Sequence, residues 1–329
     1  MFHPLLGDYS IVFGDMHPSH KKLDKIKKQD AKKEAVAVKN KNLKKNSSSS
    51  FLQSSSPNHK AGINSIMKKS ETRVRKTLEG KPEFLMSLVE TQNVLEKFAS
   101  YKTTFVVLHV DLVGSTKLAM MLPLDRLTMM IQAFNQEMSI IVKAFGGYIL
   151  KYIGDAVLAF FVLPVHKKEE EEEVKVACIN DALNCAKYMV QVARDVINPI
   201  LNQHEWPEIN LRIGVDVGEN AIIQSGWDIH HNIRKGRKDK KNIITTKYNK
   251  EQDLLVKKPV YDVLGYTTSI TVKMTAFANP NHIVIGEPVY NLLDHKQRSA
   301  FQRVNISPDL WSYVCQNAEG NIYGIYTDV

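Results

Sequence analysis

The chain has 329 residues, 43% of them hydrophobic, and a formal net charge of +9. This length suits one large domain or two small ones with a substantial core. No apolar run reaches the roughly 18 residues of a membrane span, and the N-terminus lacks a signal-peptide pattern. The three cysteines, at positions 178, 185 and 315, form no disulfide framework. We therefore expect a cytoplasmic protein with reduced, buried thiols.

The basic charge is concentrated in two segments. Residues 1–76 hold 17 basic and 6 acidic residues, and residues 230–258 hold 10 and 3, so both are strongly positive. The rest of the chain holds 17 basic and 26 acidic residues. The basic segments could contact an acidic partner, nucleic acid or anionic lipid, although a solvated surface is the simpler interpretation.

The first 76 residues are predicted to be a disordered tail, because they are rich in lysine and contain a Ser-rich run at 47–56. An amphipathic linker helix is expected within residues 77–102, since apolar residues recur at helical spacing over 83–98. The main domain is predicted to follow, over residues 103–329.

Helical and strand patterns alternate in this main domain. They predict an α+β fold in which helices cover one face of a mostly antiparallel sheet. Helices are expected over about 124–145, from 169 to near Asn198-Pro199, and over 268–279. Strands are expected over 105–111, 148–153, 156–162, 211–217, 261–265, 282–285, 310–314 and 322–326.

Two aspartates end apolar strands in glycine-containing turns. Asp111 begins the run Asp111-Leu-Val-Gly-Ser-Thr116, and Asp155 ends the run Gly146-Gly-Tyr-Ile-Leu-Lys151-Tyr-Ile-Gly-Asp155. A single aspartate in a turn is usually a turn residue or a helix cap. Two carboxylates exposed side by side at a sheet edge predict instead a divalent-cation site that handles triphosphates. The main-chain amides after Asp111 open a helix, which predicts a phosphate cradle at Gly114, Ser115 and Thr116.

Over residues 103–329 the chain resembles the catalytic domain of class III adenylyl/guanylyl cyclases. The two aspartate runs and three further blocks occur in the order of that family. The further blocks are Leu211-Arg-Ile-Gly-Val-Asp-Val-Gly218, Tyr261-Asp262-Val-Leu-Gly265 and Ala278-Asn-Pro-Asn-His-Ile-Val-Ile285.

The resemblance implies a ferredoxin-like nucleotide cyclase fold and a head-to-tail homodimer with shared sites. Each site would convert ATP to 3′,5′-cyclic AMP and pyrophosphate with two Mg²⁺ or Mn²⁺ ions. The metal-binding positions implied are Asp111, Leu112 and Asp155, and Arg212 would contact the terminal phosphates.

Lys151 and Asp262 occupy the positions that select the base in this family. Lys151 can donate to adenine N1, and Asp262 can accept from the 6-amino group. Guanine would place a carbonyl opposite the carboxylate. The sequence therefore favours ATP over GTP.

Two positions depart from the family pattern. Ser269 stands where an asparagine orients the ribose, and Lys273 stands where an arginine stabilises the transition state. Serine reaches less far, and lysine lacks the bidentate fork of arginine. Loss of one such interaction typically lowers the rate by ~10²–10³. We therefore expect either a slow cyclase with Ser269 and Lys273 as catalytic residues, or a cyclase-like module that only binds nucleotide.

A long basic insertion is a further departure. It is expected at about 230–258, between the blocks that end at Gly218 and begin at Tyr261. Together with the basic tail it is the only support for a third possibility, a nucleic-acid-binding protein.

Overall fold

The computed structural model describes residues 58–82, 88–99, 101–163, 171–231, 255–315 and 320–329. Within these residues, eight strands form one sheet in the order β2-β3-β1-β4-β6-β8-β7, with β5 also paired to β4. The strands are β1 (Lys102–Leu112), β2 (Tyr148–Ile153), β3 (Ala156–Val162), β4 (Leu211–His231), β5 (Leu255–Leu264), β6 (His282–Gly286), β7 (Phe301–Arg303) and β8 (Ile325–Asp328). All neighbouring pairs are antiparallel except β4 and β6. The predicted α+β class with a mostly antiparallel sheet is confirmed.

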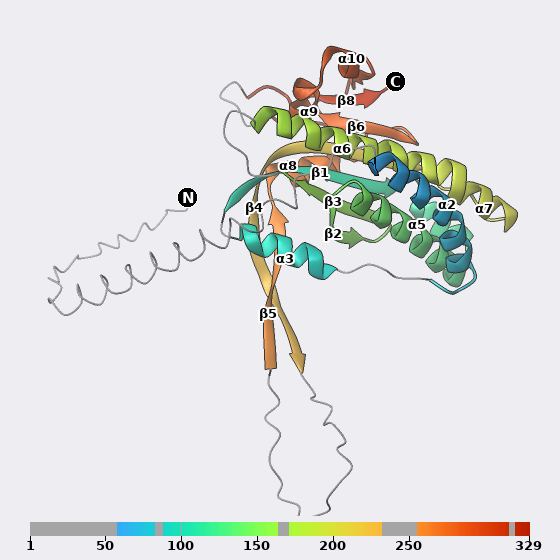
Figure 1. The fold of residues 1–329 in the computed structure, drawn as a ribbon. Helices are drawn as coiled ribbons and strands as arrows, with labels where there is room; N and C mark the ends of the chain where they lie inside the picture. The colour runs from blue at the N-terminus through green and yellow to red at the C-terminus, as the bar shows by residue number, and fades with distance from the viewer. Residues whose placement is uncertain (1–57, 83–87, 100, 164–170, 232–254, 316–319) are drawn as a thin grey trace, which may run out of the picture. The chain divides into compact units, whose positions relative to one another are not determined.

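Helices connect these strands and cover the sheet (Figure 1). None of the described helices is long and apolar enough to cross a membrane. The helices are α2 (Asn58–Leu78), α3 (Leu88–Phe98), α4 (Ser115–Met121), α5 (Leu124–Ala144), α6 (Glu171–Val192), α7 (Asn198–Gln203), α8 (Tyr266–Thr275), α9 (Glu287–Leu292) and α10 (His295–Arg298).

The two faces of β1 belong to different hydrophobic clusters. Val106 and Leu108 are buried in the largest cluster, together with Phe134 of α5 and residues of α6. Phe105 and Val107 point the other way and are buried with Leu95 of α3. Successive side chains of a strand alternate between faces, so α5 and α6 lie on one face and α3 on the other.

Helix α8 also packs on the α3 face. A Cβ added to Gly214 or Gly218 of β4 would clash with threonine side chains of α8, whereas Ile213 and Val215 point into the largest cluster. The prediction of helices on one face is therefore wrong. The helical patterns showed which residues of a helix are buried, but not against which face of the sheet.

The helix predicted to stop near Asn198-Pro199 continues. A five-residue π-helical stretch, Ala193–Ile197, joins α6 to α7. Pro199 lies in the first turn of α7, directly after this stretch. A proline has no N–H to donate to the preceding turn, and the change to π-helical geometry occurs in that turn.

The C-terminal strands differ from the expectation. Leu310 lies in a turn, and Val314 and Ile322 form only an isolated bridge. The last strand is β8, three residues later than predicted at its start. Two main-chain hydrogen bonds hold this segment: the Tyr323 amide donates to the Tyr313 carbonyl at 2.8 Å, and the Cys315 amide donates to the Asn321 carbonyl at 2.7 Å. The buried indole of Trp311 adds a bond to the Tyr323 carbonyl at 2.9 Å.

Strands β4 and β5 leave the body of the sheet together as a long two-stranded arm (Figure 1). Their ladder continues to the pair His231↔Leu255. The insertion predicted at 230–258 therefore begins and ends as paired strand, and its residues 232–254 lie outside the described residues.

Residues 61–329 form one compact unit, which includes most of α2. The prediction of a disordered tail through residue 76 is therefore wrong from Asn58 onwards, and residues 1–57 lie outside the described residues. The linker helix expected within residues 77–102 corresponds to α3, which begins at Leu88, while α2 ends at Leu78. Residues 83–87 are not among those described.

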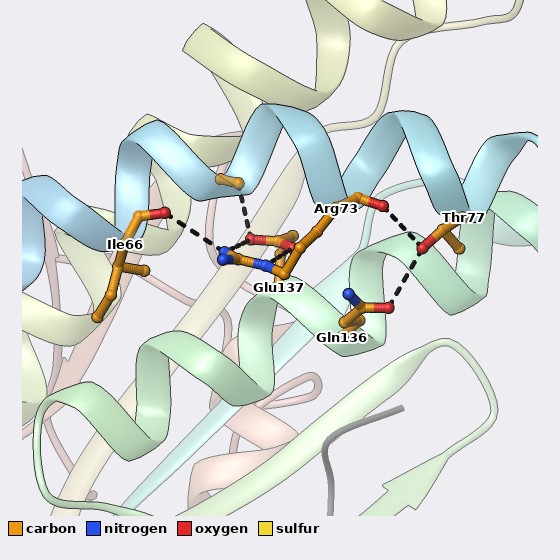
Figure 2. A network of polar contacts seen from close by, with 6 residues as sticks. Ile66, Arg73, Thr77, Gln136 and Glu137 are labelled. Atoms are coloured by element: carbon orange, nitrogen blue, oxygen red, sulfur yellow. Dashed lines mark hydrogen bonds and ion pairs between the residues drawn. The ribbon is translucent and has the colours of Figure 1, made fainter. Parts of the chain in front are cut away.

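Helix α2 binds α5 through a buried polar network (Figure 2). The guanidinium of Arg73 donates to both carboxylate oxygens of Glu137, at 2.8 and 2.6 Å. The Ser70 hydroxyl donates to Glu137 at 2.7 Å, and Thr77 donates to Gln136 at 3.2 Å. Ser70 and Thr77 take positions on the inner face where an amphipathic pattern would place apolar residues, which explains why the pattern escaped notice.

Candidate active site

Asp111 and Asp155, the acidic pair, come together because of strand register. Asp111 lies near the end of β1, and the pair Val110↔Val157 aligns β1 with β3. Asp155 lies two residues before Val157, in the tight turn that joins β2 to β3. Gly154 precedes it with φ of 63°, a conformation that glycine adopts readily.

The surroundings of Asp111 disfavour its negative charge. Burial raises the pKa of Asp111 above its usual range, and the neighbouring charge of Asp155 raises it further. The hydrogen bond and charge of Arg212 lower the pKa again, but burial is the largest cause. Two carboxylates are thus held close together, and Arg212 offsets only part of the rise in the pKa of Asp111.

The acidic pair fits a divalent cation. The Oδ2 atom of Asp155 is buried and has no hydrogen-bond partner within the described residues. Mg²⁺ commonly uses one or two carboxylates and takes further ligands from water and substrate phosphates. The described part of the chain contains no group of three or more His, Cys, Asp or Glu that could hold a metal ion. The Leu112 side chain is a buried hydrocarbon without a donor atom, so this residue could contribute only its main-chain carbonyl.

Arg212 lies directly opposite Asp111 in the β1–β4 ladder. Its Nη2 donates to Asp111 Oδ2 at 2.8 Å, while its buried Nε has no partner among the described residues. The guanidinium is therefore placed at the acidic pair with a donor unused. Its predicted contact with terminal phosphates stays a prediction.

His109 was not singled out from the sequence. It lies on the same face of β1 as Asp111, and its Nδ1 is 3.1 Å from the Thr275 hydroxyl of α8. Burial lowers the pKa of His109 to about 4, and Arg212 contributes in the same direction. At neutral pH it is an uncharged imidazole beside the acidic pair. The period-2 alternation of β1 is the signal that could have identified it.

Lys151 of β2 and Asp262 of β5 form an ion pair, here called the Lys–Asp pair. Lys151 Nζ lies 2.5 Å from Asp262 Oδ2, and the two side chains are 39% and 32% exposed. The other oxygen, Oδ1, accepts from the Val263 amide at 2.8 Å. The structure thus brings together the two residues predicted to select the base, although 111 positions separate them in sequence.

Ser269 and Lys273 are exposed and stand one helical turn apart on α8. The Ser269 hydroxyl donates to the Gly265 carbonyl at 3.1 Å. Lys273 Nζ lies 5.3 Å from the centre of the Tyr313 ring, a cation–π distance. Both groups have partners within the chain, and a substrate would have to compete with them.

Gly114 is in the left-handed region, with φ of 71°, immediately before the seven-residue helix α4. Ser115 and Thr116 form the first turn of this helix, where main-chain N–H groups lack intrahelical acceptors. The expected phosphate cradle at these residues stays a prediction.

Curated relatives give the decisive comparison. Two from Escherichia coli and one from Staphylococcus aureus are all named cytidylate cyclase. They are 30%, 24% and 33% identical over 122, 220 and 116 residues, which is 37%, 66% and 35% of this chain. The chain spans only 26%, 41% and 26% of the length of these relatives.

Over part of its length, the chain is therefore similar in sequence to proteins named cytidylate cyclase. Solved structures similar to this chain include the adenylyl cyclase CyaB from P. aeruginosa, at 17% identity and a TM-score of 0.44, covering 69% of this chain and 94% of that one. Another is the catalytic core of a rhodopsin-guanylyl cyclase with converted specificity, at 16% identity and a TM-score of 0.45. It covers 69% of this chain and 97% of that one. No family model matches the chain.

The expectation of buried thiols holds for two of the three cysteines. Cys178 and Cys185 are buried in α6, as predicted, and burial raises the pKa of Cys178 to about 12. Cys315 is only half-buried, because it lies near the surface where its thiol donates to Glu287.

Proposed function

We propose that the domain is a nucleotide cyclase, which joins the ribose 3′-oxygen to the α-phosphorus of a nucleoside triphosphate and releases pyrophosphate. The observation that carries the proposal is the acidic pair, where two carboxylates meet at a strand end and one buried oxygen lacks a partner. A structural ion pair would have matched each carboxylate with a cation of the chain. Among the described residues, Arg212 is the only cation paired with the acidic pair, and it pairs with Asp111.

Mg²⁺ or Mn²⁺ would be held by Asp111, Asp155 and the Leu112 carbonyl. When bound, the metal would lower the pKa of the 3′-hydroxyl and neutralise the triphosphate. Proton competition at Asp111 makes metal binding weaker at lower pH, because the raised pKa of this carboxyl keeps more of it protonated.

The residues of the chain would then bind and orient the substrate. Arg212 has one guanidinium donor, the buried Nε, without a partner among the described residues, and a phosphate oxygen could accept from it once the side chain moves. The first turn of α4 offers main-chain amides. Lys273 would supply positive charge as pyrophosphate leaves, and Ser269 would hydrogen-bond the ribose. Each must first leave its present partner, the Tyr313 ring or the Gly265 carbonyl.

The Lys–Asp pair presents an ammonium donor beside a carboxylate acceptor. Adenine matches this pattern, because its N1 accepts a hydrogen bond and its 6-amino group donates one. Cytosine offers the same order of groups, N3 and its 4-amino group, whereas guanine and uracil place a carbonyl where the carboxylate stands. The pair therefore suits ATP or CTP. The relatives named cytidylate cyclase favour CTP, while ATP remains the alternative that the hydrogen bonds equally support.

The complete site would lie between two head-to-tail protomers. One protomer would supply Asp111, Asp155 and Arg212, and the other would supply Lys151, Asp262, Ser269 and Lys273. Two equivalent sites would then lie about a two-fold axis.

The decisive experiment is to incubate the purified chain with each of the four ribonucleoside triphosphates and Mn²⁺ or Mg²⁺, and to identify products by mass spectrometry. Formation of cyclic CMP or cyclic AMP that stops on chelation is expected. A product only from GTP or UTP would contradict the role of the Lys–Asp pair. Absence of every cyclic product, with wild-type protein shown to bind nucleotide, would contradict the cyclase.

The second candidate is a cyclase-like module that binds nucleotide without turnover. The observation in its favour is that Ser269 and Lys273 are both engaged within the chain. A dissociation constant for CTP or ATP together with no product over hours would select this candidate.

A further inference from the structure

Helix α3 makes direct contacts with both strands that carry the Lys–Asp pair. On β5, the side chain of Gln92 binds both main-chain polar groups of Tyr261. Its Nε2 donates to the Tyr261 carbonyl at 3.0 Å, and its Oε1 accepts from the Tyr261 amide at 2.7 Å. Tyr261 is the residue immediately before Asp262.

On β2, the contact comes from the residue before Gln92. The hydroxyl of Thr91 donates to the Ile149 carbonyl at 2.8 Å, and Thr91 is buried. The register of β2 against β3 shifts between Ile149 and Lys151, so this carbonyl lies at a bulge. Bulges redirect the side chains that follow, and here Lys151 follows.

A hydrophobic contact joins the two polar ones. Leu95 of α3 is fully buried in a cluster that includes Leu150 and Val263. Leu150 precedes Lys151, and Val263 follows Asp262. Every contact of α3 named here is thus with a residue within two positions of a member of the Lys–Asp pair.

The outer edge of β5 is open to the Gln92 side chain. Among the described strands, β5 pairs with β4 alone. The amide and carbonyl of Tyr261 that point away from β4 would need another partner, and the Gln92 amide group supplies one donor and one acceptor.

We propose that Gln92 is a positioning residue for base selection: α3 fixes the separation and direction of Lys151 and Asp262 by holding the main chain beside each. This inference rests on the proposed function, because it concerns how the base is chosen. It assigns to the helix preceding the catalytic sheet a role in selectivity, distinct from the acidic pair.

The test compares Gln92→Leu with a matched control on the same helix. Leucine keeps a similar volume but cannot bind the Tyr261 main chain. Asn93 is exposed on α3 and Asn93→Leu removes an amide without touching either strand, so it is the control. For Gln92→Leu, the ratio of kcat/KM for the preferred nucleotide over GTP should fall roughly 10-fold, since small displacements of positioning groups cost this much or more. The Mn²⁺ concentration for half-maximal activity should stay unchanged.

A second measurement does not need turnover. Amide hydrogen exchange of a peptide containing Tyr261 should speed up in Gln92→Leu and not in Asn93→Leu. If Gln92→Leu is insoluble, Gln92→Glu serves instead, since its carboxylate can still accept from the Tyr261 amide but cannot donate to the carbonyl. A partial loss of selectivity is then expected.

The outcomes separate the two proposals. If wild-type protein makes no cyclic product, the proposed function fails, and the positioning role is judged by the exchange rate together with the ratio of CTP or ATP affinity to GTP affinity. An equal drop for all nucleotides with an unchanged ratio, or unchanged exchange at Tyr261, would overturn the positioning role.

Discussion

The acidic pair and the Lys–Asp pair both use strand-borne aspartates, but their surroundings are opposite. At the acidic pair, two like charges are pressed together and the pKa of Asp111 is raised, chiefly by burial. At the Lys–Asp pair, opposite charges meet at 2.5 Å and already neutralise each other. The acidic pair therefore has an excess of negative charge, whereas the charges of the Lys–Asp pair are balanced before any base binds.

The difference shows how the role of a carboxylate follows from its neighbours. Asp111 and Asp155 repel each other, so a divalent cation gains by joining them. Asp262 and Lys151 have directional donor and acceptor groups, so they can recognise a base edge by pattern. The acidic pair should therefore govern the rate, and the Lys–Asp pair should govern the choice of substrate.

The largest effect is expected from Asp155→Asn. Turnover should fall on the order of 10³-fold, about 4 kcal/mol, because metal-ion stabilisation of the transition state is lost. When a chelator has removed metal ions, the melting temperature of the variant should not fall below that of wild type, since the repulsion between Asp111 and Asp155 is removed. Near-normal turnover, or strong destabilisation, would show that Asp155 is a structural residue.

The next effect is a change of substrate rather than of rate. Lys151→Glu with Asp262→Cys should lower the preference for CTP or ATP over GTP by about 10²-fold, because a site built to hydrogen-bond one base rejects another base that leaves its groups unpaired. Competition assays with mixed nucleotides measure this ratio. The Mn²⁺ requirement serves as the control, since it should be retained.

A smaller gain is expected on α8. Ser269→Asn with Lys273→Arg should raise kcat by up to ~10-fold, more than it changes KM, because a bidentate fork helps most when charge moves onto pyrophosphate. Steady-state kinetics with both variants test this. Reduced activity would show that the Ser269–Gly265 and Lys273–Tyr313 contacts are part of the working geometry.

Mixing two inactive variants asks whether the two pairs work across an interface. Asp155→Ala and Asp262→Ala proteins, after subunit exchange, should recover roughly a quarter of wild-type activity, since half of the dimers would hold one complete site out of two. No recovery after exchange has been demonstrated with labelled subunits would exclude a shared site.

The smallest effect concerns pH. A carboxyl whose folded pKa is raised contributes stability that is present below its unfolded pKa and is lost as pH rises through the folded value. Without metal ions, the free energy of unfolding of wild-type protein should therefore fall as pH rises from the unfolded to the folded pKa of Asp111. It should fall less in Asp155→Asn, because the neighbouring negative charge is gone. Chemical denaturation at a series of pH values measures the difference between the two slopes. Equal slopes would mean that Asp155 does not perturb Asp111.

The strands that bring the acidic pair and the Lys–Asp pair together were largely predictable from sequence. Asp111, Asp155, Lys151 and Asp262 stand in short local runs with a recognisable order, and strand register does the rest. His109 and Gln92 were missed because their roles depend on partners 166 and 169 positions away in sequence. Helix α2 was missed because its inner face carries the polar residues Ser70 and Thr77. Their stabilising hydrogen bonds to Glu137 and Gln136 of α5 exist only in the folded chain.

The contact between α2 and α5 also sets the limits of any shortened version of this protein. A recombinant fragment that starts at the first strand would look reasonable from the motifs alone. It would leave Glu137, which is 1% exposed in the full chain, without the guanidinium and hydroxyl that match it. Removing one partner of a buried ion pair typically costs about 3–5 kcal/mol, a large part of the stability of an ordinary domain. Crystallisation and assay fragments should accordingly begin before Ser70.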